Sequence, residues 1–387
     1  MRIVHIITRM ILGGAQENTI LTCEGLTNRG HEVILITGPA RGPEGELLQR
    51  ARSHKYKVIV VKSLIRSINP LLDALAYRAL IKHIRKIKPD IVHTHSSKAG
   101  ILGRQAAWKV RKRLGDKPKI VHTIHGLPFH RYGNRFLNRL YIALERRAGQ
   151  YSDALISVAD AMTRQALQVR IAQQEKYTTI YSGIEINSFI NRPDDVEQFR
   201  KSLSLQDEDI LVTQVSRLAK LKGHEFILKA AERITNPRIH FCFVGDGRLR
   251  KKIEQRIRSS AWLTGRVHLT GLLPPEKMPT VFHASDFIVH CSLHEGLARV
   301  IPQAFAAGKA VISFDIDGAS EVIDDETGIL VKPTDVEELR DAIVKLASSP
   351  ELRKQMGQNG LKRVKEKFDH NIMVEKIEAL YNDLLNR

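Results

Sequence analysis

Two cationic side chains stand in a short segment between an apolar run and a helical pattern. Arg217 and Lys222 follow the apolar run at residues 210–215, and Gly223 precedes the next helix. Loops after buried strands place their side chains where α/β sheets bind ligands. An arginine guanidinium, which donates several hydrogen bonds at once, and a lysine ammonium can together bind a diphosphate. Two solvated surface charges are the plainer alternative, so this segment alone does not establish a site.

The most informative segment runs from His290 to Gly308. An apolar run ends at its start, and Glu295 and Gly296 predict a turn. A helix follows, in which Pro302 fits only near the first turn. Glu295 in the loop and Gln303 in the helix are expected to reach one ligand from two sides.

The start of that helix predicts an anion cradle, because the first N–H groups of a helix have no partner within it. The residues that supply these backbone groups are Gly296, Leu297, Ala298 and Arg299. They follow the buried strand directly, so their N–H groups are expected to face a phosphate above the sheet.

A paired glycine follows the first apolar run of the chain. Gly13 and Gly14 open a helix, so their backbone can approach an anionic ligand closely. The spacing is not the G-x-G-x-x-G fingerprint, which disfavours a dehydrogenase. A simple tight turn is the alternative.

The elements that position these residues are short apolar strands alternating with helices. Near-continuous apolar runs are typical of parallel strands buried on both faces. The strands are expected at 3–8, 32–37, 57–61, 90–94, 120–124, 154–158 and 178–180, and then at 210–215, 239–244, 266–269, 287–290, 310–313 and 328–331. The helices between them include 70–87, 134–148, 225–234 and 336–346, the last with a capping box of Thr334 and Glu337. This α/β rhythm restarts after a break at about 183–209, which predicts two doubly wound domains.

With these segments the sequence resembles the retaining family-4 glycosyltransferases over essentially its whole length. Their GT-B fold has two Rossmann-like domains that face each other across a cleft. The shared features are the Gly-Gly loop, the Arg-x4-Lys-Gly segment, a mid-domain histidine and a Glu-x7-Glu pattern in a strand-turn-helix context. The resemblance implies an acceptor-binding domain at 1–187 and a nucleotide-sugar donor domain at 188–368. It also implies a C-terminal helix at 369–387 that returns to the first domain.

The resemblance also implies roles for individual residues in a hexosyl- or N-acetylhexosaminyl-transferase. Arg217 and Lys222 would bind the donor diphosphate, Glu295 would meet the transferred sugar, and the backbone after Gly296 would cradle phosphate. His125 matches the family's cleft histidine. The implied catalytic residues are Glu295, His125, Arg217 and Lys222; the implied donor-binding residues are Gly13, Gly14, Arg217, Lys222, Gly296, Leu297, Ala298, Arg299 and Gln303.

The sequence departs from the family at one position. Gln303 occupies the place of the second Glu, whose carboxylate accepts hydrogen bonds from both ribose hydroxyls of the donor. A Gln carbonyl accepts as well, but its amide NH₂ does not. The resemblance implies front-face transfer, in which the leaving diphosphate helps to accept the acceptor's proton while Arg217 and Lys222 stabilise the developing charge.

Two groups of residues have the types that bind metals. Asp315 and Asp317 form a D-x-D pair, but two carboxylates alone are weak evidence. Five histidines near two strand ends are the other group: His93, His95, His122, His125 and His130. Histidines that line a polar cleft are commoner than a zinc site. We expect no metal and no cofactor, with the nucleotide-sugar as the donor substrate.

Positive charge is concentrated in the first half of the chain. The net charge is +19, and residues 51–150 hold 23 Lys and Arg against 4 Asp and Glu. Such asymmetry indicates an anionic partner. Within it, the segment 129–147 mixes arginines with Phe129, Tyr132 and Phe136, as at membrane interfaces. We expect contact with an anionic membrane surface and a glycan or lipid-linked acceptor, as in the synthesis of polysaccharide and cell-envelope precursors.

The location expected from the sequence is the cytoplasm, peripheral to the inner face of the membrane. The apolar start is too short for a signal-peptide core, and no apolar run is long enough to span a bilayer. Cys23, Cys242 and Cys291 are widely separated and predict buried free thiols.

Two other functions remain as alternatives. A GT-B sugar-nucleotide epimerase would use the same phosphate cradle without an acceptor. A basic nucleic-acid-binding protein would explain the charge, but no recognised nucleic-acid module is present, so we expect no nucleic-acid partner.

Overall fold

The chain folds as two units, each built on its own parallel sheet. The computed structural model describes residues 1–40 and 45–387. The first unit comprises Met1–Gly183 together with His370–Arg387, and the second comprises Ile184–Asp369. The predicted boundaries, 187/188 and 368/369, lie four residues and one residue from these positions.

Hydrogen bonds on either side of the first boundary explain its position. Gly183 N–H donates to Met373 Sδ (3.2 Å) within the first unit. The next residue, Ile184, donates to the carbonyl of Phe368 (2.9 Å) and pairs with Asp369 within the second unit. The outgoing and returning stretches of chain are therefore neighbours in the second unit.

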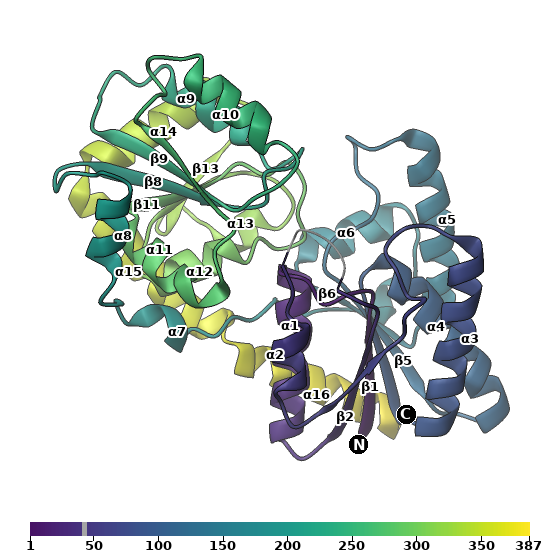
Figure 1. Ribbon diagram of the computed structural model, residues 1–387. Helices are drawn as coiled ribbons and strands as arrows, with labels where there is room; N and C mark the ends of the chain where they lie inside the picture. Colours follow the sequence, from purple (N-terminus) through teal and green to yellow (C-terminus); the bar gives the residue numbers. More distant parts are fainter. Residues whose placement is uncertain (41–44) are drawn as a thin grey trace. The chain divides into compact units, whose positions relative to one another are not determined.

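The sheet of the first unit has the order β3-β2-β1-β4-β5-β6-β7, and all its pairs are parallel (Figure 1). Its strands are β1 (Arg2–Ile7), β2 (Glu32–Thr37), β3 (Lys57–Val60), β4 (Ile91–His95), β5 (Lys119–Ile124), β6 (Ala154–Ser157) and β7 (Tyr177–Thr179). The central strands are almost entirely buried, as expected for a sheet covered on both faces.

Helices cover both faces of this sheet. They are α1 (Gly14–Asn28), α2 (Leu48–Arg52), α3 (Pro70–Ile87), α4 (Ser97–Leu114), α5 (Arg135–Tyr151), α6 (Asp160–Gln168), the short η1 (Gln174–Lys176) and the C-terminal α16 (His370–Asn386). Ile3 and Ile7 of β1 pack with α1 and α16, whereas Val4 and Ile6 pack with α3 and α4. Because strand side chains alternate between faces, this pattern divides the sheet residues into two layers.

The sheet of the second unit has the order β10-β9-β8-β11-β12-β13 and is also parallel. Its strands are β8 (Ile210–Val215), β9 (Ile239–Val244), β10 (Val267–Gly271), β11 (Phe287–His290), β12 (Val311–Phe314) and β13 (Gly328–Val331). The predicted fold class, two doubly wound parallel α/β domains, is confirmed.

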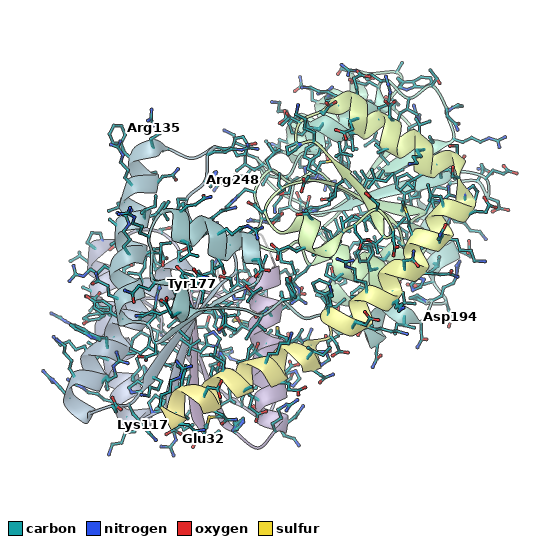
Figure 2. All side chains as sticks on the ribbon, turned by 180° about the vertical axis from the view of Figure 1, so that it is seen from behind. Glu32, Lys117, Arg135, Tyr177, Asp194 and Arg248 are labelled. Carbon is teal, nitrogen blue, oxygen red and sulfur yellow. The ribbon has the colours of Figure 1, made fainter. Side chains whose placement is uncertain are left out.

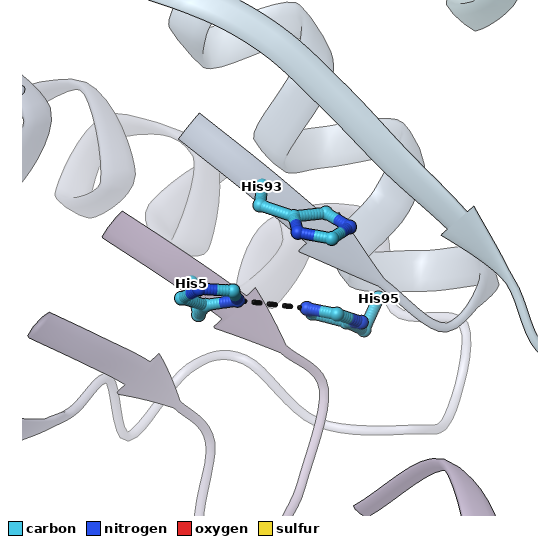
Figure 3. Close-up of side chains that lie close together, drawn as sticks. All are labelled: His5, His93 and His95. Carbon is cyan, nitrogen blue, oxygen red and sulfur yellow. Dashed lines mark hydrogen bonds between the residues drawn. The ribbon is translucent and has the colours of Figure 1, made fainter. Parts of the chain in front are cut away.

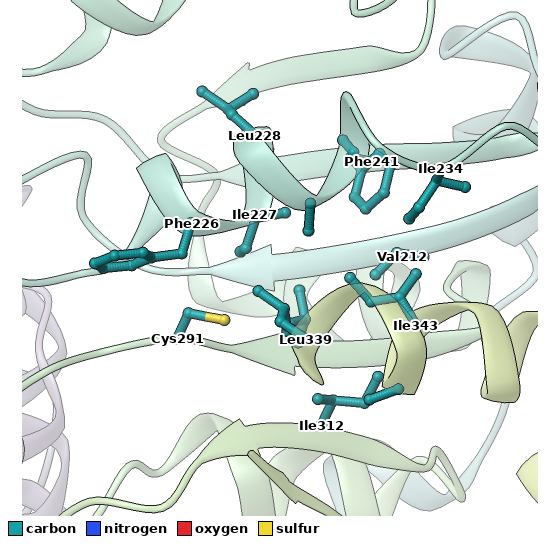
Figure 4. Packing of buried hydrophobic residues seen from close by; sticks show 14 of the residues in the cluster. Val212, Phe226, Ile227, Leu228, Ile234, Phe241, Cys291, Ile312, Leu339 and Ile343 are labelled. Carbon is teal, nitrogen blue, oxygen red and sulfur yellow. The ribbon is translucent and has the colours of Figure 1, made fainter. Parts of the chain in front are cut away.

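The core of the second unit lies between this sheet and its helices. They are α7 (Asn187–Ile190), α8 (Val196–Ser202), α9 (His224–Ala231), α10 (Arg250–Arg258), η2 (Pro275–Lys277), α11 (Met278–Ala284), α12 (Val300–Ala306), α13 (Ala319–Val322), α14 (Val336–Ser348) and α15 (Pro350–Lys367). Figure 4 shows Val212, Phe241 and Ile312 of the strands against Ile227 of α9 and Leu339 of α14. The loops at the strand ends thus have a rigid support.

Helix α14 is capped differently from the sequence prediction. The side chain of Asp335, not Thr334, accepts hydrogen bonds from the N–H groups of Glu337 (3.1 Å) and Glu338 (3.0 Å). Thr334 has a left-handed backbone with φ 71°. An ionised N-cap also interacts favourably with the helix dipole, which favours Asp335 over Thr334.

Candidate functional site

In both sheets, successive strands are added first on one side of the first strand and then on the other, so the direction of winding reverses. In the second unit β9 and β10 lie on one side of β8, whereas β11, β12 and β13 lie on the other. In the first unit the reversal lies between β1 and β4. Doubly wound sheets bind ligands beyond the carboxyl ends of the strands at such a reversal. The segments that the sequence singled out follow β8 and β11 in one unit and β1 in the other.

The loop after β8 carries Arg217 and Lys222 and ends at Gly223, the N-cap of α9. Gly223 has φ 75°, and a Cβ atom at this position would lie 1.8 Å from the carbonyl oxygen of Cys291. Glycine can adopt this left-handed conformation so close to neighbouring backbone because it has no Cβ atom. The loop after β8 is therefore held directly against the loop after β11.

Hydrogen bonds join these two loops. Leu293 N–H donates to the carbonyl of Leu221 (2.7 Å), and the Ser292 hydroxyl donates to the same oxygen (3.0 Å). The buried amide of Gln214, at the end of β8, donates to the Lys222 carbonyl (2.8 Å) and accepts from Cys291 N–H (3.3 Å). Sequence reasoning missed Gln214, because its partners are distant in sequence or belong to the backbone.

The chemical centre of this region is the contact between Lys222 and Glu295. The Lys222 ammonium donates to Glu295 Oε1, and His290 Nε2 lies 3.4 Å from the same oxygen. Each side chain of the Lys222–Glu295 pair is only about a fifth exposed. Burial alone would raise the pKa of Glu295, but the charge of Lys222, the hydrogen bond that Lys222 donates and the neighbouring His290 hold this pKa well below its ordinary value. Glu295 is thus an ionised hydrogen-bond acceptor at neutral pH.

Asp317 supports the Glu295 loop. Its Oδ2 accepts a hydrogen bond from Glu295 N–H (2.7 Å) and lies 3.6 Å from His294 Nδ1. Asp317 has a left-handed backbone, φ 49°. Its partner in the D-x-D pair, Asp315, bonds through its backbone to Val331. Asp317 therefore positions Glu295, a role that the sequence pattern did not indicate.

The predicted phosphate cradle lies just before a short helix. Gly296, Leu297, Ala298 and Arg299 form the loop that leads into α12, whose seven residues begin at Val300. Pro302 is the third residue of α12, as its ring requires. Gln303 lies in the same helix and is partly buried. The contacts of these residues with a ligand remain predictions.

In the first unit the candidate residues occupy the corresponding edge of the sheet. Gly13 is the N-cap of α1, and Gly14 is its first residue. His125 directly follows β5, half-buried, and its Nε2 lies 3.0 Å from His95 Nδ1. The hydroxyls of Thr8 and Ser96 lie 2.7 Å apart and link the ends of β1 and β4. The site residues are thus divided, with Gly13, Gly14 and His125 in one unit and the others in the second.

The histidines of the first unit separate into two layers. His93 and His95 share a buried cluster with His5, and one ring nitrogen from each of the three lies within 4.8 Å of the other two (Figure 3). His122 faces the other layer, where its Nδ1 lies 2.9 Å from the Thr94 hydroxyl. Sequence reasoning missed His5, because a single histidine in an apolar strand carries no pattern.

Near the starts of α3 and α5, which both pack against α4, the first unit exposes apolar side chains, and α5 adds arginines. Phe136 at the start of α5 is 78% exposed, and Leu71 at the start of α3 is 79% exposed. Figure 2 shows Arg135 projecting from the same end of α5. We call this the α3–α5 surface; it comprises Ile68, Leu71, Leu75, Arg131, Tyr132, Arg135, Phe136, Leu137, Arg139 and Leu140. Phe129, predicted to join it, is instead buried at 8% exposure.

Within the described residues, no helix combines the length and apolarity needed to cross a bilayer. The three cysteines are free and buried, as the sequence predicted.

Both halves of the chain match known families. Residues 12–188 match the model of Glycosyltransferase Family 4, and residues 195–363 match that of Glycosyl transferases group 1.

Curated relatives match over nearly the full length. The UDP-Gal:alpha-D-GlcNAc-diphosphoundecaprenol alpha-1,3-galactosyltransferase of Escherichia coli is 29% identical, over 99% of this chain and 97% of that protein. The capsular polysaccharide biosynthesis glycosyltransferase CapM of Staphylococcus aureus is 24% identical, over 88% of each.

Solved structures share the fold. Anabaena HepE in complex with UDP-glucose superposes with a TM-score of 0.84 at 21% identity, covering 99% of this chain and 100% of that one. The sucrose-phosphate synthase of Thermosynechococcus elongatus gives a TM-score of 0.82 at 20% identity, with full coverage of both. The protein is therefore a glycosyltransferase with the GT-B fold, and its two halves match the family 4 and group 1 models.

Proposed function

We propose that this protein is a retaining glycosyltransferase that moves a hexosyl or N-acetylhexosaminyl group from a UDP-sugar to a lipid-linked glycan. The second unit would bind the donor, and the first unit would bind the acceptor. The observation that carries the donor assignment is the Lys222–Glu295 pair, held by two interlocked loops where the second sheet reverses its winding.

The chemistry of the pair supports a sugar diphosphate as its ligand. Lys222 and Arg217 supply positive charge for a diphosphate that leaves in the transition state. Ionised Glu295 accepts hydrogen bonds from hydroxyls of the transferred sugar. Gln303 would contact the ribose through its carbonyl. This arrangement needs no metal, because cationic side chains and the backbone N–H groups of residues 296–299 meet the phosphate charge.

The relatives support the choice of donor and acceptor. The name of the Escherichia coli relative specifies a UDP-sugar donor and a diphosphoundecaprenol-linked acceptor, and HepE was solved with UDP-glucose. We extend both classes, a UDP-sugar and a lipid-linked glycan, to this chain. His125 and the loop of Gly13 and Gly14 would contribute from the first unit.

The α3–α5 surface supports a site of action at the cytoplasmic face of an anionic membrane. Arginines there can meet lipid headgroups, and each basic residue near such a surface contributes about 1 kcal/mol. Phe136 and Leu71 would enter the interface. Both helices follow parallel strands, so their first turns lie at the same sheet edge as Gly13 and His125.

The donor assignment is tested by turnover of a panel of nucleotide-sugars with and without a lipid-linked acceptor. Glu295→Ala should nearly abolish transfer, and Lys222→Ala should cost about 2.7–4 kcal/mol of transition-state stabilisation, as for one lost preorganised donor. Glu232→Ala is the control, because it removes a carboxylate from an exposed ion pair with Arg256 in the same unit. Near-normal turnover by Glu295→Ala would refute the assignment, and donor conversion without acceptor would indicate an epimerase.

The membrane assignment is tested by co-sedimentation with liposomes. Binding should require anionic lipid, weaken as salt rises and fall when Arg131, Arg135 and Arg139 are all changed to Glu. In the control variant, Lys251, Lys252 and Arg258 are changed to Glu. These are exposed residues of α10, and the change in net charge is the same. If both triple variants lose binding equally, the α3–α5 surface is not the contact.

A further inference from the structure

Three histidines, on the neighbouring strands β1 and β4 and directly after β5, form a continuous hydrogen-bonded chain in the first unit. His5 Nδ1 on β1 lies 3.0 Å from His95 Nε2 at the end of β4, the contact drawn in Figure 3. The other nitrogen of His95, Nδ1, lies 3.0 Å from Nε2 of His125. The chain therefore runs from the interior of the sheet to the edge where the candidate site lies.

The two inner members of this chain are neutral. His5 and His95 are completely buried. Burial lowers the pKa of His5 to about 3 and takes the pKa of His95 well below its ordinary value. A neutral imidazole carries one proton, so one ring nitrogen donates and the other accepts.

This rule leaves two arrangements of protons along the chain. His95 uses both nitrogens, so it donates either to His5 or to His125. If it donates to His5, the proton of His5 must reside on Nε2. If it donates to His125, the proton of His5 resides on Nδ1 and is used in the bond to His95.

His5 decides between the two arrangements. Its Nε2 is buried and has no hydrogen-bond partner among the described residues. A proton there would be a buried donor without an acceptor, and orphaned buried N–H groups are rarer than under-used acceptors. The favoured arrangement has His5 donating to His95 and His95 donating to His125.

We propose that His5 and His95 are positioning residues that fix the tautomer of His125, with Nε2 accepting from His95 and the ring proton on Nδ1. The significance for transfer rests on the proposed function, in which His125 belongs to the site. The Nε2 atom of His125 is then occupied by the bond from His95 and does not remove a proton from a substrate. This fits a reaction in which the leaving diphosphate takes the acceptor's proton.

The neighbouring His93 distinguishes this chain from a metal site. Its Nδ1 lies 2.5 Å from the Tyr381 hydroxyl on α16, and its Nε2 lies 2.7 Å from the Thr123 hydroxyl. Because His93 and His95 each use both nitrogens, a metal bound by His5, His93 and His95 would have to displace one of these bonds of His93 and one of the two bonds of His95. The geometry thus favours hydrogen bonds over coordination.

The direct test is nitrogen-15 NMR of the full-length protein labelled at histidine. The ring signals of His125 are assigned as those that disappear from the spectrum of the His125→Gln variant. We expect the neutral ring of His125 to carry its proton on Nδ1, against the preference of free histidine for Nε2. A proton on Nε2 of His125 would overturn the proposal. The proposal would also be overturned if the protein co-purified with a stoichiometric amount of zinc and the His93→Leu variant did not. This measurement needs no activity, so it stands even if the proposed transfer reaction fails.

Variants then test the positioning role. His95→Leu should shift His125 towards the Nε2–H tautomer without raising the KM for the donor. It should lower kcat about ten- to hundredfold, by analogy with the loss of a partner that orients a metal-ligating histidine. His95→Asn keeps an amide N–H donor near the position of Nδ1, so it should restore both the Nδ1–H tautomer of His125 and kcat. His122→Asn, a buried histidine of the other layer, is the control. An unchanged His125 tautomer in His95→Leu would refute the role of His95.

Discussion

The contact between the loops after β8 and β11 predicts a sharp difference between two glycine substitutions. Gly223 and Gly265 have nearly the same left-handed backbone, φ 75° and 78°. A Cβ atom on Gly223 would lie 1.8 Å from the Cys291 carbonyl oxygen, whereas one on Gly265 would meet nothing within 4 Å. Ala at the two positions thus imposes the same backbone strain, but only Gly223→Ala forces the loops apart.

The magnitudes follow from these two contributions. A left-handed non-glycine residue costs about 1–2 kcal/mol, and replacing Gly by Ala restores about 0.4–1 kcal/mol through the unfolded chain. Gly265→Ala should therefore lower the free energy of unfolding by roughly 0.5–1 kcal/mol. Displacing packed atoms adds about 1–3 kcal/mol, so Gly223→Ala should cost roughly 1.5–4 kcal/mol.

Urea unfolding compares the two variants within one unit, because both positions lie in the second. Calorimetric titration with UDP measures the consequence for the site. Gly223→Ala should weaken UDP binding at least about tenfold if separation of the loops costs 1.4 kcal/mol of binding, while Gly265→Ala should bind normally. Equal losses of stability and unchanged UDP affinity in both variants would refute the interlocked loops as the support of the site.

Three further results are expected. The depressed pKa of Glu295 means that its stabilising contribution is fully present above its ordinary value of 4.5 and is lost as the pH falls through the folded pKa. The stability difference between the wild type and Glu295→Gln should therefore be equal at pH 7 and pH 6 and shrink in acid; a difference that shrinks between pH 7 and pH 6 would contradict pairing with Lys222. Gln303→Glu should keep or raise donor affinity in a titration, because a carboxylate accepts more strongly than an amide, and a large loss would mean that the pocket is built around the amide. Transfer should survive EDTA, whereas complete loss restored by Mn²⁺ or Mg²⁺ would make Asp315 and Asp317 metal ligands.

The sequence predicted most of the fold because its strands are buried on both faces. Near-continuous apolar runs such as 210–215 and 239–244 are typical of such strands, and the observed β8 and β9 have these bounds. The loops after β8 and β11 were also found, since glycine, proline and charge occur there together. Their contact at Gly223 was not, because close approach between segments far apart in sequence leaves no local pattern.

Two residues that the sequence did not single out, Gln214 and His5, share one property with Asp317, whose role it did not indicate. Gln214, Asp317 and His5 each act through partners that only the parallel sheet brings near them. The amphipathic pattern of α5 did not by itself decide whether its apolar side chains are buried. Phe136 and Leu140 have the spacing of a core face, yet both are exposed, because periodicity defines a face of a helix but not what covers it.

The path of the chain between the two units has a consequence for biosynthesis. The second unit is one continuous stretch, Ile184–Asp369, whereas the first is completed only by α16. That helix contributes Met373, Val374, Ile377, Tyr381 and Leu384 to the core of the first unit. Domains generally fold as units while the chain emerges from the ribosome. The second unit thus has all its residues before the first unit has α16. Until residues 370–386 have emerged, the sheet face of the first unit that carries Ile3 and Ile7 lacks the helix that covers it.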